Sequence, residues 1–295
     1  MALTVLGRPV RLSFAWLKPP PTPPDGSMTL FEHLRELRYR LVIAVGAILL
    51  GMILSAVFYG QLFDILRHPY DVAIAQLKEK NPDQITDLVN IGLASPFTLL
   101  LKVCLVSGLV LTSPVWLYQL WSFIVPGLLA KEKKWAMIFI GTATPLFLAG
   151  VVTGYLIMPK GIAVLLGFTQ DGVANLQNIN DFLSFMLRLM VVFGIAFLIP
   201  LIVLMLNIVG VVKASQLSKA RIYVIFGTFV FGAVATPSTD PFSMLALAIP
   251  MALLFLVAEA LAHVLDRRKA KRALEGDGAV VLHDKALDDL DTTSD

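Results

Sequence analysis

The sequence predicts an all-α membrane protein with six transmembrane helices, arranged as a kinked and cupped bundle with both chain termini in the cytoplasm. The 295 residues are 57% hydrophobic and only 15% charged, with a mean hydropathy of +0.78, whereas about a quarter of a soluble domain is charged. Several uncharged runs reach the roughly 18–20 residues that a helix needs to cross about 30 Å of hydrocarbon. Lys and Arg are unevenly spread, and in membrane proteins they favour the cytoplasmic side.

The chain is expected to have three parts. Residues 1–27 form a flexible cytoplasmic tail, because Arg8 and Arg11 interrupt any apolar signal-peptide run and the Pro-rich stretch PPPTPPDGS follows. Residues 28–265 hold all six spans. Residues 266–295 form a basic and then acidic cytoplasmic tail, which is expected to be disordered.

An amphipathic helix is expected to lead into the first span. Thr29-x-x-Glu32 has the spacing of a capping box at a helix N-terminus. Leucines spaced by three and four residues then make one apolar stripe: Leu30, Leu34, Leu37 and Leu41. The first span follows over about 41–59, and 60–94 is expected to be an external loop carrying short helices.

The remaining spans are expected from the uncharged runs. Three long ones each contain a proline that should kink the helix, and two short ones have about 27 Å of helix each, joined by the turn TPSTDP. The long spans are 95–122 with Pro114, 135–158 with Pro145 and 182–209 with Pro200, and the short spans are 222–239 and 241–258.

Charge sets the orientation. Segments 1–40, 123–134, 210–221 and 263–295 together carry 18 of the 24 Lys and Arg residues, so these segments are expected inside. If only one of the two short spans crossed, the run DRRKAKR would lie outside, against that rule.

No catalytic, metal or cofactor site is expected. The four histidines, His33, His68, His263 and His283, are scattered, and no HExxH, GxSxG, P-loop or Gly-rich dinucleotide motif occurs. The single cysteine, Cys104, lies in an apolar run and fits a small core residue. No nucleic-acid partner is expected.

Three charges fall within or near the spans. Lys102 and Arg188 either extend to the outer headgroups or make polar contacts within the bundle or with a partner helix, and the sequence leaves both open. Glu259 lies one turn before His263 near the inner end of the last span, which favours an interfacial pair.

Two glutamates stand among basic residues on the expected inner face. On pattern alone, Glu36 would form a helix ion pair with Arg40. Glu132 would belong to a solvated charge run with the lysines on either side.

Several stretches resemble the TatC family, the multispanning subunit of the twin-arginine protein translocase. The resemblance covers about 28–272, in order. It rests on FEHLRELRYR (31–40), ASPFTLLLK (94–102), SPVWLYQLWSFIVPGLLAKEKK (113–134), FGIAFLIP (193–200) and TPSTDPFSMLALAIP (236–250).

The resemblance implies a signal-peptide receptor that exports folded proteins from a bacterial cytoplasm across the plasma membrane, driven by the proton-motive force. Glu36 and Glu132 match the acidic positions that bind the arginine pair of the leader, and Arg38 and Phe123 match other positions linked to recognition. Two carboxylates at the lipid boundary suit adjacent guanidinium groups, because these offer planar pairs of donors that lysine lacks. Outer-face positions important for function are matched by Pro69 and Asp240.

The resemblance also implies partners and has departures. Single-span subunits of the TatA and TatB type, the lipid bilayer and further copies of the chain in a hetero-complex are expected. The family commonly has acidic residues where this chain has Leu198 and Leu256, although Glu259 lies one turn after the second. A secondary transporter of a small solute is the alternative, and it would need repeated halves and a polar midplane site; the sequence has neither. A purely structural scaffold is a further rival.

Overall fold

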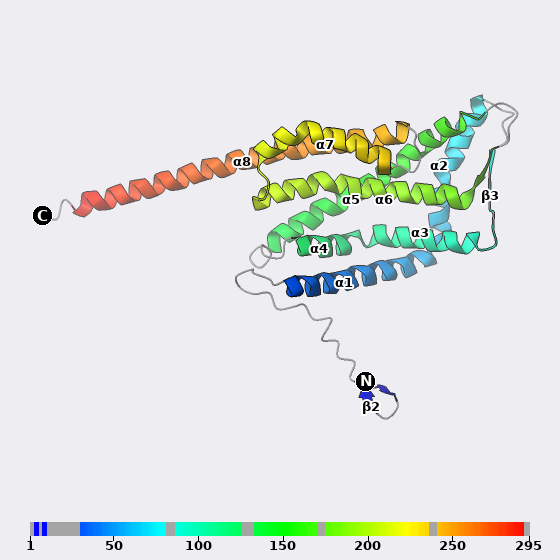
Figure 1. The fold of residues 1–295 in the computed structure, drawn as a ribbon, viewed down its shortest axis with the longest axis horizontal. Coiled ribbons are helices and arrows are strands. Elements are labelled where there is room, and N and C mark those ends of the chain that lie inside the picture. Colours follow the sequence, from blue (N-terminus) through cyan, green and yellow to red (C-terminus); the bar gives the residue numbers. More distant parts are fainter. Residues whose placement is uncertain are drawn as a thin grey trace. The chain divides into compact units, whose positions relative to one another are not determined.

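The computed structural model describes residues 3–5, 8–10, 30–80, 86–124, 133–169, 175–235 and 241–291. Within these ranges the chain is mostly helical (Figure 1). Its contacts divide it into two compact units, residues 1–194 and 195–295. The helix α6, Ile179–Val209, runs from the first unit into the second.

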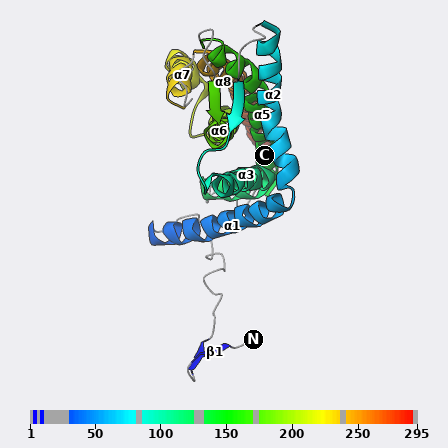
Figure 2. The same ribbon diagram turned by 90° about the vertical axis from the view of Figure 1, so that its right-hand side faces the viewer.

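Helix α1, Leu30–Val57, joins the amphipathic segment and the first span without a break. After the turn at Phe58, the chain enters α2, Tyr59–Lys80. The sequence predicted a loop carrying short helices over 60–94, whereas the structure has one long helix up to residue 80, with β3 after it. Figure 2 shows α1 beneath α3 and α2 rising along α5.

The second span is broken rather than merely kinked. Helices α3, Ser95–Leu111, and α4, Ser113–Ile124, meet at Thr112 with a bend of 64°. Pro114 has no N–H to continue the helical ladder. Near the break, the indole Nε1 of Trp116 donates to the carbonyl of Leu109 at 2.9 Å, so a side chain adds a hydrogen bond across the bend.

The third and fourth spans are longer than predicted. Helix α5, Lys133–Leu166, contains Pro145 and Pro159, and α6 contains Pro200. Within the described ranges, five helices are long and apolar enough to cross a membrane, and the bent α3–α4 pair makes up to six. This agrees with the six predicted spans, while the side on which each terminus lies stays a prediction.

Glycines allow two pairs of helices in the first unit to approach closely. A Cβ at Gly108 of α3 would lie 2.5 Å from the backbone nitrogen of Met52 in α1, and Gly51 faces Gly108 across the same contact. A Cβ at Gly150 of α5 would lie 2.5 Å from the carbonyl oxygen of Phe193 in α6. Small residues at such crossings let helix backbones pack in contact, as is common in membrane proteins.

Two short strands join segments far apart in the chain. Strand β3, Thr86–Val89, pairs in parallel with β4, Asn175–Asn178, in the register Thr86 to Asn175. The all-α prediction did not include this pair. A second pair, β1 (Leu3–Val5) with β2 (Arg8–Val10), is antiparallel and lies in the segment expected to be a flexible tail.

The second unit contains the last two spans. Helix α6 ends at Gly210, whose φ is 92°, and the N–H groups of Gly210 and Val211 donate to Asn207 and Leu206 at 3.0 and 2.9 Å. This is the Schellman arrangement that ends a helix on a glycine. Helix α7, Ala214–Ala235, then packs against α8, Pro241–Asp291.

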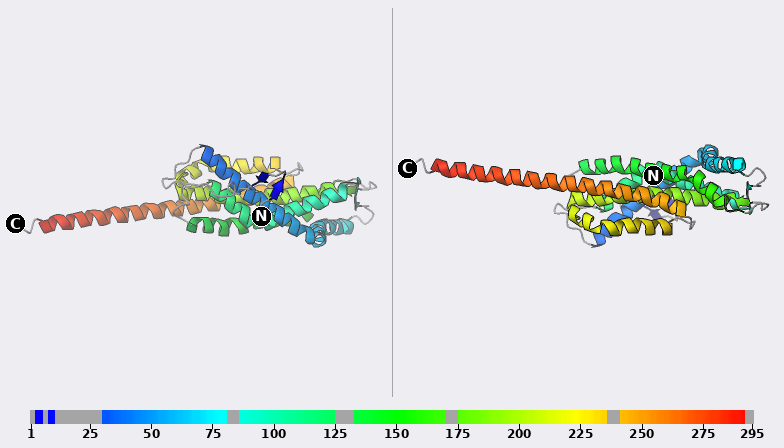
Figure 3. Two further views of the ribbon diagram at one scale, coloured as in Figure 1. Left: turned by 90° about the horizontal axis from the view of Figure 1, so that it is seen from below. Right: turned by 90° about the horizontal axis from the view of Figure 1, so that it is seen from above.

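Helix α8 continues beyond the last predicted span. It is drawn as one helix through the orange and red part of the chain in Figure 3, although disorder is predicted after residue 265. Ala, Leu, Arg, Lys and Glu dominate the start of this segment, and all are good helix formers. A domain boundary at 265–266 stays a prediction.

We expect Gly108→Ala to lower the melting temperature of the detergent-solubilised chain, because the added methyl group forces α1 and α3 apart at an overpacking penalty of about 1–3 kcal/mol. The matched control is Gly46→Ala in α1, where an added Cβ meets nothing within 4 Å. Equal melting temperatures for the two variants would contradict the close α1–α3 contact.

Candidate functional site

Glu36 lies on the face of α1 that packs against α4, and it is 3% exposed. Its Oε1 accepts hydrogen bonds from both Nε and Nη2 of Arg40, with Nε at 2.8 Å. Its Oε2 is buried and has no hydrogen-bond partner among the residues that the structure describes. The ion pair expected from spacing alone is therefore present, but it uses only one of the two carboxylate oxygens.

A groove with a volume of about 220 Å³ lies beside this pair, between α1 and the α3–α4 segment. Phe123, at the end of α4, contributes to its wall and stacks on His33, with the two ring centroids 4.6 Å apart. We call Glu36, Arg40, Phe123 and this groove the α1–α4 cradle. The groove is lined by Leu37, Arg40, Leu41, Ala44, Val45, Ile48, Leu109, Trp116, Gln119, Leu120 and Phe123.

The structure brings some of the predicted recognition residues together and leaves others apart or undescribed. Glu36 and Phe123 lie at the same α1–α4 contact. Arg38 is on α1 but exposed, away from the buried face that carries Glu36. Glu132 and Asp240 lie outside the described residues, so their distances from the cradle are not defined.

Pro69 is fully buried in the middle of α2. A proline has no N–H, so the carbonyl of Ile65, four residues earlier, loses its helical donor. The hydroxyl of Tyr155 in α5 donates to that carbonyl at 2.9 Å. The proline thus creates an acceptor that fastens α2 to α5.

Tyr70, next to Pro69, is also buried, and its ring packs edge-on against Phe182 at 5.2 Å between centroids. Burial is the main cause that raises the pKa of its hydroxyl to about 12, with Asp87 and Asp71 adding to it. The side chain therefore stays neutral at any physiological pH.

Lys102 makes contacts within the first unit rather than extending to headgroups. Its Nζ donates to Asn180 Oδ1 and Ser184 Oγ, both at 2.8 Å. The Asn180 amide in turn donates to Ser95 Oγ at 3.0 Å. Of the two alternatives for Lys102, the structure supports the polar contact, and this contact joins the first turns of α3 and α6. Arg188 is exposed on α6.

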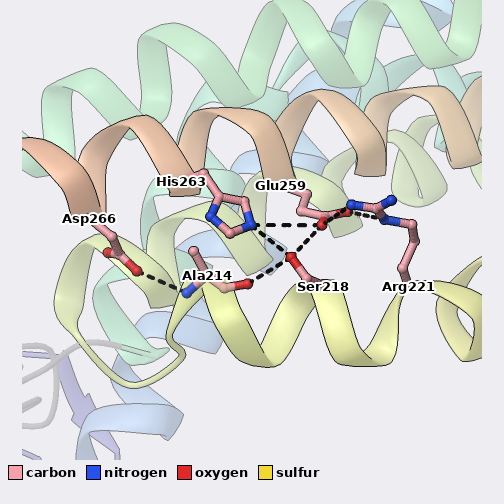
Figure 4. A network of polar contacts seen from close by, with 6 residues as sticks. All are labelled: Ala214, Ser218, Arg221, Glu259, His263 and Asp266. Carbon is pink, nitrogen blue, oxygen red and sulfur yellow. Dashed lines mark hydrogen bonds and ion pairs between the residues drawn. The ribbon is translucent and has the colours of Figure 1, made fainter.

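Glu259 is 2% exposed on α8, and its main partner is Arg221 of α7 (Figure 4). Arg221 donates Nε to Oε2 at 2.9 Å and Nη2 to Oε1 at 2.6 Å, using both carboxylate oxygens. Ser218 donates to Oε1 at 2.7 Å. His263, the partner expected from spacing, lies 3.9 Å from Oε1 and instead contacts Ser218 Oγ at 2.7 Å.

Asp266 was not predicted as a site residue. Its Oδ2 accepts the backbone N–H of Ala214 at 2.9 Å, so α8 caps the start of α7, and its Oδ1 accepts from Asn207 at 3.2 Å. A carboxylate is favoured at a helix N-terminus. The sequence feature that could have identified Asp266 is its position as the single acidic residue at the start of the basic run DRRKAKR.

No metal centre is found in the part of the chain that the structure describes: it contains no group of three or more His, Cys, Asp or Glu side chains placed to hold a metal ion.

Comparison with known proteins gives a consistent picture. A family model described as Sec-independent protein translocase protein (TatC) matches residues 32–250. The chain is 42% identical over 252 residues to the TatC protein of Frankia casuarinae, covering 84% of this chain and 69% of that protein. It is 35% identical to the Aquifex aeolicus TatC protein, covering 82% and 98%. A crystal structure of the twin arginine translocase receptor TatC in DDM matches with a TM-score of 0.66 and 34% identity, covering 78% of this chain and 99% of that one.

We expect Tyr155→Phe to destabilise the chain by about 1 kcal/mol, because the carbonyl of Ile65 loses its donor. In a Pro69→Ala background the same change should have almost no effect, because the alanine restores the backbone N–H. Urea or thermal unfolding of the four proteins in detergent measures the coupling. Additive effects of the two changes would show that Tyr155 does not compensate for the proline.

We expect Arg221→Gln to lower stability more than His263→Gln does, because it removes two charge-assisted hydrogen bonds from a buried carboxylate. His263→Gln should lower it by less than about 1 kcal/mol, because its ion pair is long and half-exposed. Thermal unfolding of the full chain measures which variant loses more stability. A larger loss for His263→Gln would show that His263, the partner expected from spacing, is the main partner of Glu259.

Proposed function

This chain belongs to the TatC family of Sec-independent protein translocases, and we propose that its α1–α4 cradle binds the arginine pair of a signal peptide. The chain is a multi-pass membrane component of a bacterial twin-arginine translocation system. The residues that we propose to contact the leader are those of the cradle.

One observation carries the proposal: Glu36 is a buried carboxylate with one unused oxygen. A buried acceptor without a partner is unfavourable, and more so when it is charged. Because Oε2 has no partner within the described structure, an incoming donor can form a charge-assisted bond there without displacing another protein donor from that oxygen.

The chemistry of the cradle suits arginine. A guanidinium presents two parallel N–H groups to the two oxygens of a carboxylate, whereas a lysine ammonium acts as a point charge. The groove beside Glu36 is walled mostly by apolar side chains, so it suits the apolar part of a leader. Arg35 and Arg38 are exposed on α1, the helix that carries Glu36. They would hold the start of α1 at anionic headgroups.

Glu132 would supply the second carboxylate. Helix α4, which carries Phe123, packs against α5, which begins at Lys133. Glu132 immediately precedes α5, so the proposal places it on the connection that leaves the cradle. Two carboxylates would account for the requirement for two arginines.

The wider assembly is proposed from family membership. We expect single-span partner subunits of the TatA and TatB type, several copies of this chain in one complex, and the proton-motive force as the energy source. The chain would act as a receptor and scaffold and not as an enzyme, with Pro69 and Asp240 acting on the outer face.

Solute transport is not the function. The family assignment identifies a protein translocase. The cavity of about 410 Å³ in the first unit, near the α3–α4 break, is lined by eleven apolar side chains or prolines against three hydroxyls, those of Ser107, Ser113 and Thr144. A polar solute site of the kind expected at a transporter midplane would need more polar groups than this.

We expect Glu36→Gln to weaken binding of an arginine-pair leader by about ten- to hundredfold, the loss of one charge-assisted bond of about 1.5–3 kcal/mol. Export of a folded reporter in cells and crosslinking of a synthetic leader to residues near 36 and 132 are the two measurements. A Lys-pair leader should crosslink far less than the Arg-pair leader.

The matched control is Asp71→Asn. Asp71 accepts from Arg67 in the same i,i+4 arrangement, but on an exposed face of α2. Unchanged export by Glu36→Gln, or equal labelling by the two leaders, would rule out the cradle as the reader of the arginine pair.

A further inference from the structure

Arg40 occupies Glu36 in the way that an external arginine would. It lies one turn further along α1, its Nε is 2.8 Å from Oε1, and its Nη2 contacts the same oxygen. Its side chain is 20% exposed, against 4% for Glu36. The carboxylate that the proposed function assigns to the leader is therefore already covered by a guanidinium of the same chain.

The geometry of this internal pair is incomplete. Both Arg40 donors converge on Oε1, whereas the strongest arrangement places two parallel N–H groups on the two oxygens. Within the described ranges, Oε2 is left buried and unpaired. The contrast is visible within the same chain, because Arg221 does use both oxygens of Glu259. An external arginine free to approach side-on can make the bond that Arg40, tied to the same helix, does not.

Arg40 can also leave Glu36 without being stranded. Its side chain lines the groove of the cradle together with Leu37, Gln119 and Phe123. A long cationic side chain near the end of a membrane helix readily extends to the headgroup region. Such a movement would free Oε1, the oxygen that Arg40 contacts.

We propose that Arg40 is an internal competitor of the cargo: it holds Glu36 in the empty receptor and is displaced by a leader arginine. This inference rests on the proposed function of Glu36. Its consequence is a threshold for specificity, because a ligand must bind the carboxylate better than an arginine does. A lysine, with no planar fork, does not displace Arg40 but would bind more readily once Arg40 is gone.

The competing explanation is that the pair only supports the helix, as many i,i+4 pairs do with a small effect. The two explanations predict opposite signs. A helix-supporting pair gives weaker or unchanged leader binding when Arg40 is replaced, whereas a competitor gives tighter binding.

The test uses the full chain in nanodiscs of zwitterionic lipid and fluorescent synthetic leaders that differ only in Arg-Arg or Lys-Lys. We expect Arg40→Gln to lower the Kd for the Arg-pair leader by about two- to fivefold, the worth of a weak ion pair. The Lys-pair leader should gain more, so that the ratio of the two Kd values narrows. Arg40→Lys retains the charge and the fold but removes the planar pair of guanidinium donors. It should shift both Kd values in the same directions as Arg40→Gln, but by smaller amounts.

Two controls separate competition from simple charge. Arg35→Gln removes the same charge from an exposed neighbour that faces away from Glu36, because adjacent helix residues do not share a face. It should leave the ratio of Kd values unchanged. Thermal unfolding of each variant confirms that the binding changes occur in folded protein.

The possible results test the competitor role of Arg40 separately from the proposed binding of the leader by Glu36. If Glu36→Gln loses the leader while Arg40→Gln and Arg40→Lys leave affinity and discrimination unchanged or weaker, the competitor role is overturned and the cradle remains. If Glu36→Gln binds both leaders like the unaltered chain, the proposed function itself fails.

Discussion

The absence of water in the bilayer core constrains this structure more than any other factor. A backbone or side-chain polar group in hydrocarbon must find its partner within the protein. At three described places a side chain supplies a hydrogen-bond partner at a helix break, at a proline or at a helix start. Trp116 serves the carbonyl at the α3–α4 break, Tyr155 serves the one released by Pro69, and Asp266 caps the start of α7. Pro69 therefore provides an attachment point between α2 and α5.

Among the described residues, Glu36 carries the one buried carboxylate oxygen without a hydrogen-bond partner, although some buried hydroxyl and indole groups, such as those of Ser122 and Trp121, share that lack. The chain satisfies Glu259 completely, with Arg221 and Ser218 around a carboxylate of similar burial. It leaves one oxygen of Glu36 unpaired beside a groove. A buried carboxylate oxygen that stays unpaired beside a groove is suited to a ligand, which is the basis of the proposed binding of a leader arginine.

The spans could be predicted because length and hydropathy are local properties of each helix, and the amphipathic start of α1 followed from leucine spacing alone. Partners far along the chain could not be predicted. Lys102 bonds residues 78 and 82 positions away, and Arg221 reaches Glu259 across 38. Spacing favoured His263 for Glu259, but a two-pronged bond from another helix prevailed. Helix α2 was predicted only as short helices within a loop, because Asp64, Arg67 and Asp71 keep its hydropathy low, although charge does not prevent a long helix from forming.

The parallel pairing of β3 with β4 has a consequence for biosynthesis. Strand β3 precedes α3, and β4 immediately precedes α6, so the pairing requires a crossover containing α3, α4 and α5. Because chains are made from the N-terminus, residues 86–89 leave the ribosome long before 175–178 exist to bond them. The nascent protein must therefore carry an open strand edge until more than half of its length has been synthesised, and the join that aligns α3 with α6 is a late event in assembly.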